Sequence, residues 1–144
     1  MAAQEAETSP NEANRLETSG ELEVRLASQC GVDEMAPFLY SSEPRVLQAL
    51  LANSHFGERE ALLLLNRRDL PSSVIQELVS LRPILNSYAV KRALTKHPGT
   101  PVRIALAQLK FLYLFDLVSV SLQAGVPSEV KRASEELILA QLPK

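Results

Sequence analysis

Two histidines, one cysteine and one Ser-x-x-Lys pattern are the side chains whose types could support catalysis or metal binding. His55 and His97 lie in different predicted turns, and the acids closest to His55 are Glu58 and Glu60. A general base or a metal site needs further partners. The two acids stand at a predicted helix start, where they interact favourably with the helix dipole. His97 precedes a proline and is expected to end a helix, so both histidines are interpreted as structural.

The cysteine and the Ser-x-x-Lys pattern do not predict an enzyme either. Cys30 is the single cysteine, which excludes an internal disulfide and a multi-cysteine metal site. Ser128 and Lys131 match the pattern of serine acyl-enzymes, but the accompanying S-D-N and K-T-G motifs do not occur. The five glycines are isolated, so no phosphate-binding loop is predicted. We therefore expect no catalytic residue, no metal site and no cofactor.

A span without acidic residues is the most informative charge pattern. It runs from Leu78 to Phe115 and contains six basic residues, Arg82, Lys91, Arg92, Lys96, Arg103 and Lys110. Arg92 and Lys96 have the i, i+4 spacing of neighbours on one helix face, and Arg103 and Lys110 follow at i, i+7. These six are the predicted binding residues for an acidic partner. The alternative is a solvated surface that keeps the protein soluble.

The elements that must position these residues recur along the chain. Four valines lie 28 residues apart, and each follows a helix-start signal that contains proline: Val46, Val74, Val102 and Val130. Helix starts are predicted near residues 43, 57, 71, 87, 101, 114 and 127. Stacked pairs of short helices share one continuous core. The sequence thus predicts an all-α fold, a short right-handed α-solenoid of two-helix repeats with a period of about 28 residues. The alternative is an irregular helical bundle.

A second column of apolar residues supports the same repeat. Leu62, Val90 and Val118 share the 28-residue offset. All four valines of the first column are expected to be buried at equivalent points.

The N-terminal segment differs from the rest of the chain. Residues 1–25 carry six acids and two bases, a net charge of −4, so the remainder carries +2 of the total of −2. Residues 1–18 have few large apolar side chains and are predicted to be a disordered acidic tail. The helical repeat domain is predicted over 19–144, with Ser19 as the first N-cap and Gly31 as the residue after the first helix. Leu22, Leu26 and Cys30 would form its apolar stripe.

The sequence also bears on location. The N-terminus lacks the basic and apolar regions of a signal peptide. A single thiol is compatible with a reducing compartment, and we expect a cytoplasmic protein. The longest apolar window, 106–125, is interrupted by Lys110 and Asp116, so it predicts a buried helix pair and no membrane partner.

Three segments resemble the second helix of HEAT-like repeats, including the short type found in phycobilisome-lyase-like proteins: VKRAL (90–94), VRIALAQL (102–109) and VKRASEEL (130–137). The Thr-Pro-Val opening at 100–102 is closer to the leucine-rich repeat variant, another short α-solenoid unit. The resemblance covers about residues 20–144. It implies a helical repeat fold that serves as a binding surface for proteins, and sometimes for nucleic acid.

These observations predict a non-catalytic protein–protein interaction module whose protein partner the sequence does not identify, and the basic span favours an acidic partner. The alternative is a nucleic-acid-binding domain that uses the basic span 82–110. Tyr88, Phe111 and Tyr113 lie in or near that span, but their helical spacing predicts core positions rather than base-stacking platforms. A third class, an enzyme or a lyase-type chaperone, lacks candidate residues.

Overall fold

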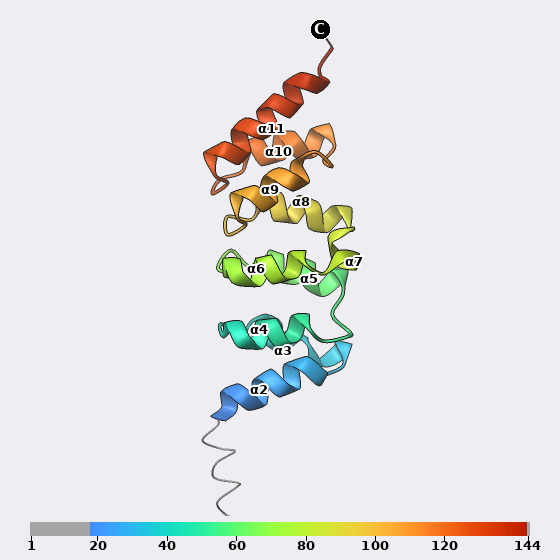
Figure 1. The fold of residues 1–144 in the computed structure, drawn as a ribbon, viewed down its shortest axis with the longest axis vertical. Helices are drawn as coiled ribbons and strands as arrows, with labels where there is room; N and C mark the ends of the chain where they lie inside the picture. The colour runs from blue at the N-terminus through green and yellow to red at the C-terminus, as the bar shows by residue number, and fades with distance from the viewer. Residues whose placement is uncertain (1–17, 144) are drawn as a thin grey trace, which may run out of the picture. The chain divides into compact units, whose positions relative to one another are not determined.

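The structure of the protein is a computed structural model that describes residues 18–143. Over these residues the protein is all-helical (Figure 1). Within that range it contains ten α-helices and one 3-10 helix and no strand. The helices are α2 (Thr18–Gln29), η1 (Val32–Glu34), α3 (Ala36–Leu39), α4 (Pro44–Leu51), α5 (Glu58–Leu65), α6 (Ser72–Val79), α7 (Arg82–Leu85), α8 (Tyr88–Lys96), α9 (Val102–Leu109), α10 (Leu114–Leu122) and α11 (Ser128–Gln141).

The helices form two compact units, one that ends at Phe56 and one that begins at Gly57. The predicted disordered tail, residues 1–18, lies outside the described residues except for Thr18, where α2 begins. None of the helices over 18–143 is both long enough and apolar enough to span a bilayer.

The predicted helix starts are confirmed. The seven helices α4, α5, α6, α8, α9, α10 and α11 begin within one residue of the predicted positions. Local chemistry explains this agreement. Pro44 opens α4 with a fixed φ at a position that needs no donor. The Glu60 carboxylate accepts the Gly57 N–H at 2.9 Å before α5, and Ser87 Oγ accepts the Val90 N–H at 3.4 Å in α8.

The valine column is only partly as predicted. Val46, Val74 and Val130 are fully buried, but Val102 is half-buried and is the first residue of its helix rather than the third. The first residues of α4, α6, α9 and α11 are 44, 72, 102 and 128, which are 28, 30 and 26 apart. The one-turn helix α7 lengthens the connection from α6 to α8 by two residues relative to that from α4 to α5. This insertion displaces α9, so Ile104 takes the third position there.

The first unit packs α2 and α3 against α4. Its core includes Met35, Leu39, Val46, Leu47 and Leu50. The predicted apolar stripe of the first helix is wrong, because Leu22 and Leu26 are exposed and Cys30 is half-buried, whereas Ala27 is fully buried. The helix is therefore rotated so that its smallest apolar side chain faces α4. A small residue at a helix contact lets the two backbones approach closely.

A buried asparagine holds the end of α2. Asn53 Nδ2 donates to the carbonyl oxygens of Ala27 and Cys30, both at 2.9 Å, and its Oδ1 accepts the His55 N–H at 2.8 Å. Gly31 follows the first helix as predicted, but its φ of −79° lies outside the left-handed region that a glycine cap uses. Since the last carbonyls of a helix need donors, the side chain of Asn53 takes the role that the glycine was expected to have.

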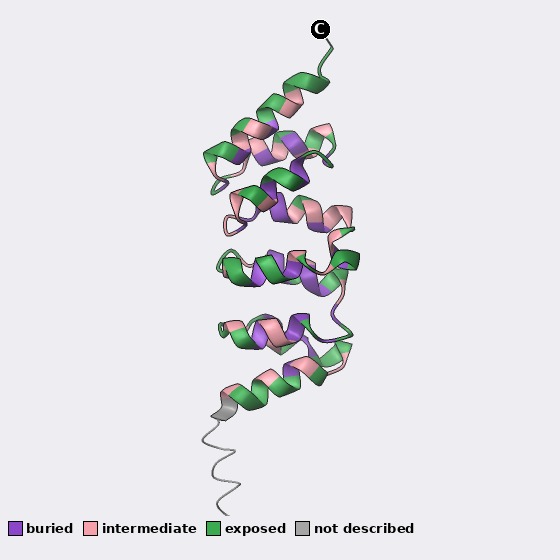
Figure 2. Cartoon of the chain, in the orientation of Figure 1, coloured by how far each residue is buried: buried purple, intermediate pink, exposed green. Residues whose placement is uncertain are grey.

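In the second unit, α8 packs against both α5 and α10, and α9 packs against both α8 and α11. A core cluster of this unit joins α9, α10 and α11 through Ala105, Leu109, Leu117, Val120 and Val130. Figure 2 shows buried positions interspersed with exposed ones along α9 and α10, whereas the C-terminal end of α11 is exposed.

Hydrogen bonds between residues 27 to 29 apart link equivalent places in successive helix pairs of this unit. Ser72 Oγ donates to the Gly99 carbonyl at 2.7 Å, and Ser87 Oγ donates to Glu58 at 2.7 Å. Tyr88 donates to Asp116 in the same way. Polar side chains at helix starts thus hold each pair against the next.

Candidate binding surface on α5, α8 and α10

Three helices of the second unit present the same register to solvent. Counted from the first residue of each helix, the third or fourth and the seventh positions are buried in α5, α8 and α10. The second and fifth positions of these helices, the ninth position of α8 and α10, and Asn66 directly after α5 point away from the core and are exposed or half-buried. We call this surface the open face; it consists of Arg59, Leu62, Asn66, Ala89, Arg92, Lys96, Phe115, Val118 and Leu122.

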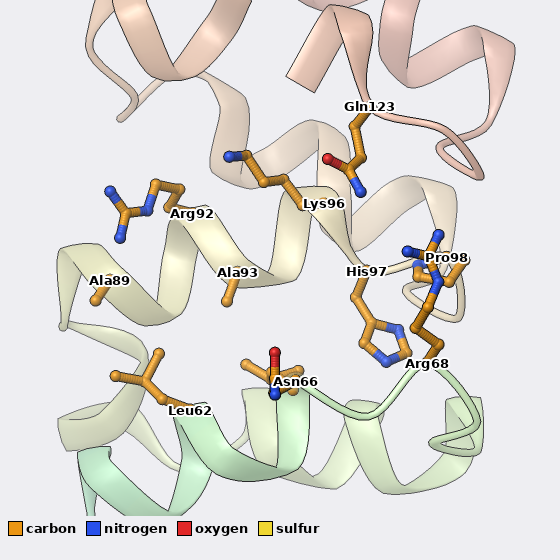
Figure 3. Close-up of a pocket in the computed structure, with 11 residues that line it drawn as sticks. Leu62, Asn66, Arg68, Ala89, Arg92, Ala93, Lys96, His97, Pro98 and Gln123 are labelled. Carbon is orange, nitrogen blue, oxygen red and sulfur yellow. The ribbon is translucent and has the colours of Figure 1, made fainter. Parts of the chain in front are cut away.

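A groove of about 360 Å³ lies in the open face between α5 and α8. Figure 3 shows Ala89 and Ala93 of α8 facing Leu62 of α5 and Asn66 directly after it, while Gln123 approaches from the end of α10. The small alanine side chains leave the space that forms the groove. The side chains of Leu62, Ala89 and Ala93 can contact apolar side chains of a ligand. The amides of Asn66 and Gln123 can form hydrogen bonds with its backbone groups.

Three cations line this groove: Arg68 from the turn after α5, and Arg92 and Lys96 from α8 (Figure 3). Arg92 and Lys96 lie on the same side of α8 because Val90 and Leu94 turn the opposite side into the core. Two like charges at i, i+4 destabilise a helix by roughly 0.2–0.5 kcal/mol. Lys96 offsets part of this cost, since it lies in the last turn, where the helix dipole favours a cation.

The six predicted binding residues do not form one cluster with the groove. Arg92 and Lys96 line it, whereas Arg103 and Lys110 are exposed on and just after α9 and do not. Lys91 and Lys110 instead flank Phe111, with their Nζ atoms 4.3 and 5.3 Å from the ring centroid. The sixth residue, Arg82, is exposed at the start of α7.

The prediction that the aromatic residues of the span belong to the core is wrong for two of the three. Phe111 is 49% exposed and Tyr113 is 72% exposed, and Tyr88 is half-buried. The rings of Tyr88 and Tyr113 stack with centroids 4.8 Å apart. Leu109 and Leu112 fill the core positions at this turn, which leaves Phe111 and Tyr113 outside the core, whereas Tyr88 packs against its edge.

Several groove and open-face residues were not predicted as site residues. Arg68 lies before the acid-free span, and its Nη2 donates to the Ala124 carbonyl at 3.2 Å, which ties the turn after α5 to the turn after α10. Phe115, Val118 and Leu122 follow at i, i+3 and i+7, a spacing that the sequence displays but that is equally typical of a buried face. Only their exposure distinguishes the two cases.

Arg92 takes part in a polar network between α8 and α10. Its Nη1 lies 3.7 Å from an Asp116 carboxylate oxygen, and the other carboxylate oxygen accepts the Tyr88 hydroxyl hydrogen. The Tyr113 N–H donates to the Tyr88 oxygen at 3.0 Å. Burial, followed by the hydrogen bond to Asp116, raises the pKa of Tyr88. The tyrosine therefore keeps its proton and serves to orient Asp116 and, through it, Arg92.

His97, at the end of the groove, is held by the backbone. Its Nε2 hydrogen bonds to the Arg67 carbonyl, and its Nδ1 accepts the Gly99 N–H at 2.9 Å. These partners define a neutral ring with the proton on Nε2. Burial lowers the pKa of His97. Because both nitrogens are engaged, the ring positions the turn between α8 and α9 and has no free lone pair for a ligand. The predicted structural role of His97 at the end of a helix agrees with this geometry.

Over residues 18–143, no group of three or more His, Cys, Asp or Glu side chains is placed to hold a metal ion. Comparison of the chain with models of known protein families, with curated proteins and with solved structures gave no match.

Proposed function

We propose that this protein is a non-catalytic protein–protein interaction module built as a short right-handed α-solenoid of HEAT-like, two-helix repeats. The observation that carries the proposal is the shared register of α5, α8 and α10, which aligns exposed side chains of three neighbouring helices on the open face. Successive helices in one register are what solenoids use to make extended binding surfaces.

The composition of the open face supports binding rather than catalysis. A catalytic site needs a nucleophile or general base that can reach a substrate. His97, the imidazole beside the groove, uses both nitrogens for backbone contacts. The groove offers cations, amides and small apolar groups, which recognise a ligand without changing it. We place this activity in the cytoplasm, where the single thiol of Cys30 would stay reduced.

The proposal is tested by site-specific crosslinking in cells. A photo-crosslinking amino acid replaces Ala93 in the groove floor, and the matched control replaces Ala140, which is exposed on α11. We expect discrete protein adducts at position 93 that resist nuclease and are weaker at position 140. Adducts that disappear with nuclease, or equal labelling at both positions, would contradict a protein-binding function of the open face.

One observation favours a second candidate function, nucleic-acid binding through the span 82–110. Lys91 and Lys110 flank the half-exposed Phe111 ring, an arrangement that can stack a base between phosphate contacts. If this function holds, the affinity for a single-stranded oligonucleotide falls steeply with salt. Phe111→Ala then weakens binding at every salt concentration. Lack of any effect of this substitution would remove the candidate.

A further inference from the structure

We infer that the open face binds an acidic amphipathic helix of a partner protein. This inference rests on the proposed function and specifies the chemistry of the partner. Apolar side chains of the bound helix cover a ridge on α10, and its carboxylates pair with the cations of α8 and of the turn after α5.

The ridge consists of Phe115, Val118 and Leu122, which lie on one side of α10. Phe115 is 88% exposed and Leu122 is 77% exposed. Scattered exposed apolar residues are common, but three at i, i+3 and i+7 form a continuous stripe on one helix. Such a stripe is favourable only when another apolar surface covers it. It matches the spacing of anchors on an amphipathic helix.

The cations beside the ridge determine the charge of the partner. Arg92 and Lys96 occupy the same helical positions on α8 as Val118 and Leu122 do on α10, and α8 and α10 are neighbours. Among residues 18–143, no carboxylate lies within 4 Å of Lys96 or Arg68, and Arg92 shares only Asp116, at 3.7 Å. The open face therefore combines an apolar ridge with Lys96, which has no carboxylate partner among the described residues, and with Arg92, whose one carboxylate partner there is Asp116. Arg68 adds a further positive charge beside the groove. A partner with leucine-type anchors and flanking Glu or Asp residues complements both.

The apolar ridge also favours a protein over a nucleic acid as the ligand of the open face. Aliphatic side chains such as Val118 and Leu122 provide no stacking platform for bases. The Lys91–Phe111–Lys110 cluster, which does combine an aromatic ring with cations, is made of residues outside the open face. A protein helix uses the whole of the open face, whereas a nucleic acid would leave the most exposed apolar side chains uncovered.

The test measures binding of the full chain to a fluorescent, 18-residue synthetic helix with leucines at i, i+3 and i+7 and glutamates beside them. We expect at least tenfold weaker binding of a peptide with the same composition in scrambled order. Phe115→Ser/Leu122→Ser and Arg92→Gln/Lys96→Gln should each weaken binding at least tenfold. The matched control Arg103→Gln/Lys110→Gln removes the same charge outside the open face and should change binding less than threefold.

A charge exchange provides the second arm. Arg92→Glu/Lys96→Glu should restore binding to a peptide in which lysines replace the glutamates. Circular dichroism checks that each variant remains helical. Equal losses in the Arg92/Lys96 and Arg103/Lys110 variants would overturn the inference, because they indicate general electrostatic attraction. So would tighter binding of a single-stranded oligonucleotide to the same residues.

The two proposals fail in different ways. If the acidic helix does not bind but position 93 still crosslinks to protein, the partner chemistry is wrong and the interaction module stands. If position 93 gives no protein adduct, the module itself is refuted.

Discussion

At the scale of single residues, Asn53 is the most consequential polar side chain of the first unit. It is buried and makes three hydrogen bonds to backbone groups of Ala27, Cys30 and His55. Removing the amide leaves the Cys30 carbonyl and the His55 N–H without a partner inside the protein, and the Ala27 carbonyl keeps only the weak contact with the Cys30 thiol at 3.8 Å. Each group that loses its partner costs desolvation energy.

We therefore expect Asn53→Ala to lower the free energy of unfolding by about 1–3 kcal/mol. Urea unfolding followed by circular dichroism measures this change. Asn86→Ala is the matched control, because Asn86 is exposed at the end of α7, and it should alter stability by less than about 0.5 kcal/mol. Similar effects of the two substitutions would show that Asn53 does not hold α2.

His97 makes stability depend on pH in a defined direction. Burial lowers its pKa in the folded protein below the ordinary value of 6.5. Between these two pKa values the unfolded chain binds more protons than the folded one, so the free energy of unfolding rises with pH. The contribution is constant above about pH 6.5 and is lost progressively as the pH falls below it.

We expect the difference in unfolding free energy between the wild type and His97→Gln to shrink as the pH is lowered from 7 to 5. Thermal unfolding at several pH values measures it. Asp69, whose pKa is lowered by its hydrogen bond to Arg67, titrates well below this range and does not obscure the result. A difference that is constant with pH would show that folding leaves the pKa of His97 unchanged.

At the scale of elements, the position of α9 is the feature that the repeat pattern alone does not explain. The extra residues around α7 move the start of α9, so Val102 is the first residue of its helix and is half-buried, whereas Val130 is the third residue of α11 and is fully buried. Two valines in one sequence column therefore have different environments.

Val130→Ala should cost about 1–3 kcal/mol of stability, because it leaves a cavity in the core cluster of α9, α10 and α11. Val102→Ala should cost less than about 1 kcal/mol, since its side chain is already partly hydrated. Chemical denaturation of the two variants under the same conditions measures both losses of stability. Equal losses of stability in the two variants would show that Val102 and Val130 are buried to the same extent, as a strict 28-residue repeat predicts.

At the scale of the whole molecule, charge divides unevenly along the chain. Residues 1–17 contain four acids and one base, a net of −3, so the remaining residues carry +1 of the total of −2. Removal of residues 1–17 changes the sign of the net charge. Because that segment contains few large apolar side chains, its composition predicts little contribution to stability.

A chain that begins at Thr18 should therefore unfold within about 2 °C of the full-length protein, which is no more than the shift that about 1 kcal/mol produces in a protein of this size. Scanning calorimetry measures both midpoints. A markedly lower midpoint for the shortened chain would mean that residues 1–17 pack against the helices.

The sequence by itself determined where most helices begin. Prolines, Ser87 and Glu60 act on backbone groups within three residues of themselves, so their effect is readable without knowledge of the fold. The all-helical class follows from the same local signals. The pair Arg92 and Lys96 could also be predicted, because residues four apart on one helix are neighbours in any tertiary structure.

Only the tertiary structure decided which apolar residues are buried and which cations share a site. Leu22 and Phe115 have the spacing of core residues, yet they are exposed, because the helix that carries each packs through its other side. Arg68 joins Arg92 at the groove although 24 positions separate them in the sequence. Burial and long-range proximity depend on how helices pack against one another, and packing is a property of pairs of elements that no single segment contains.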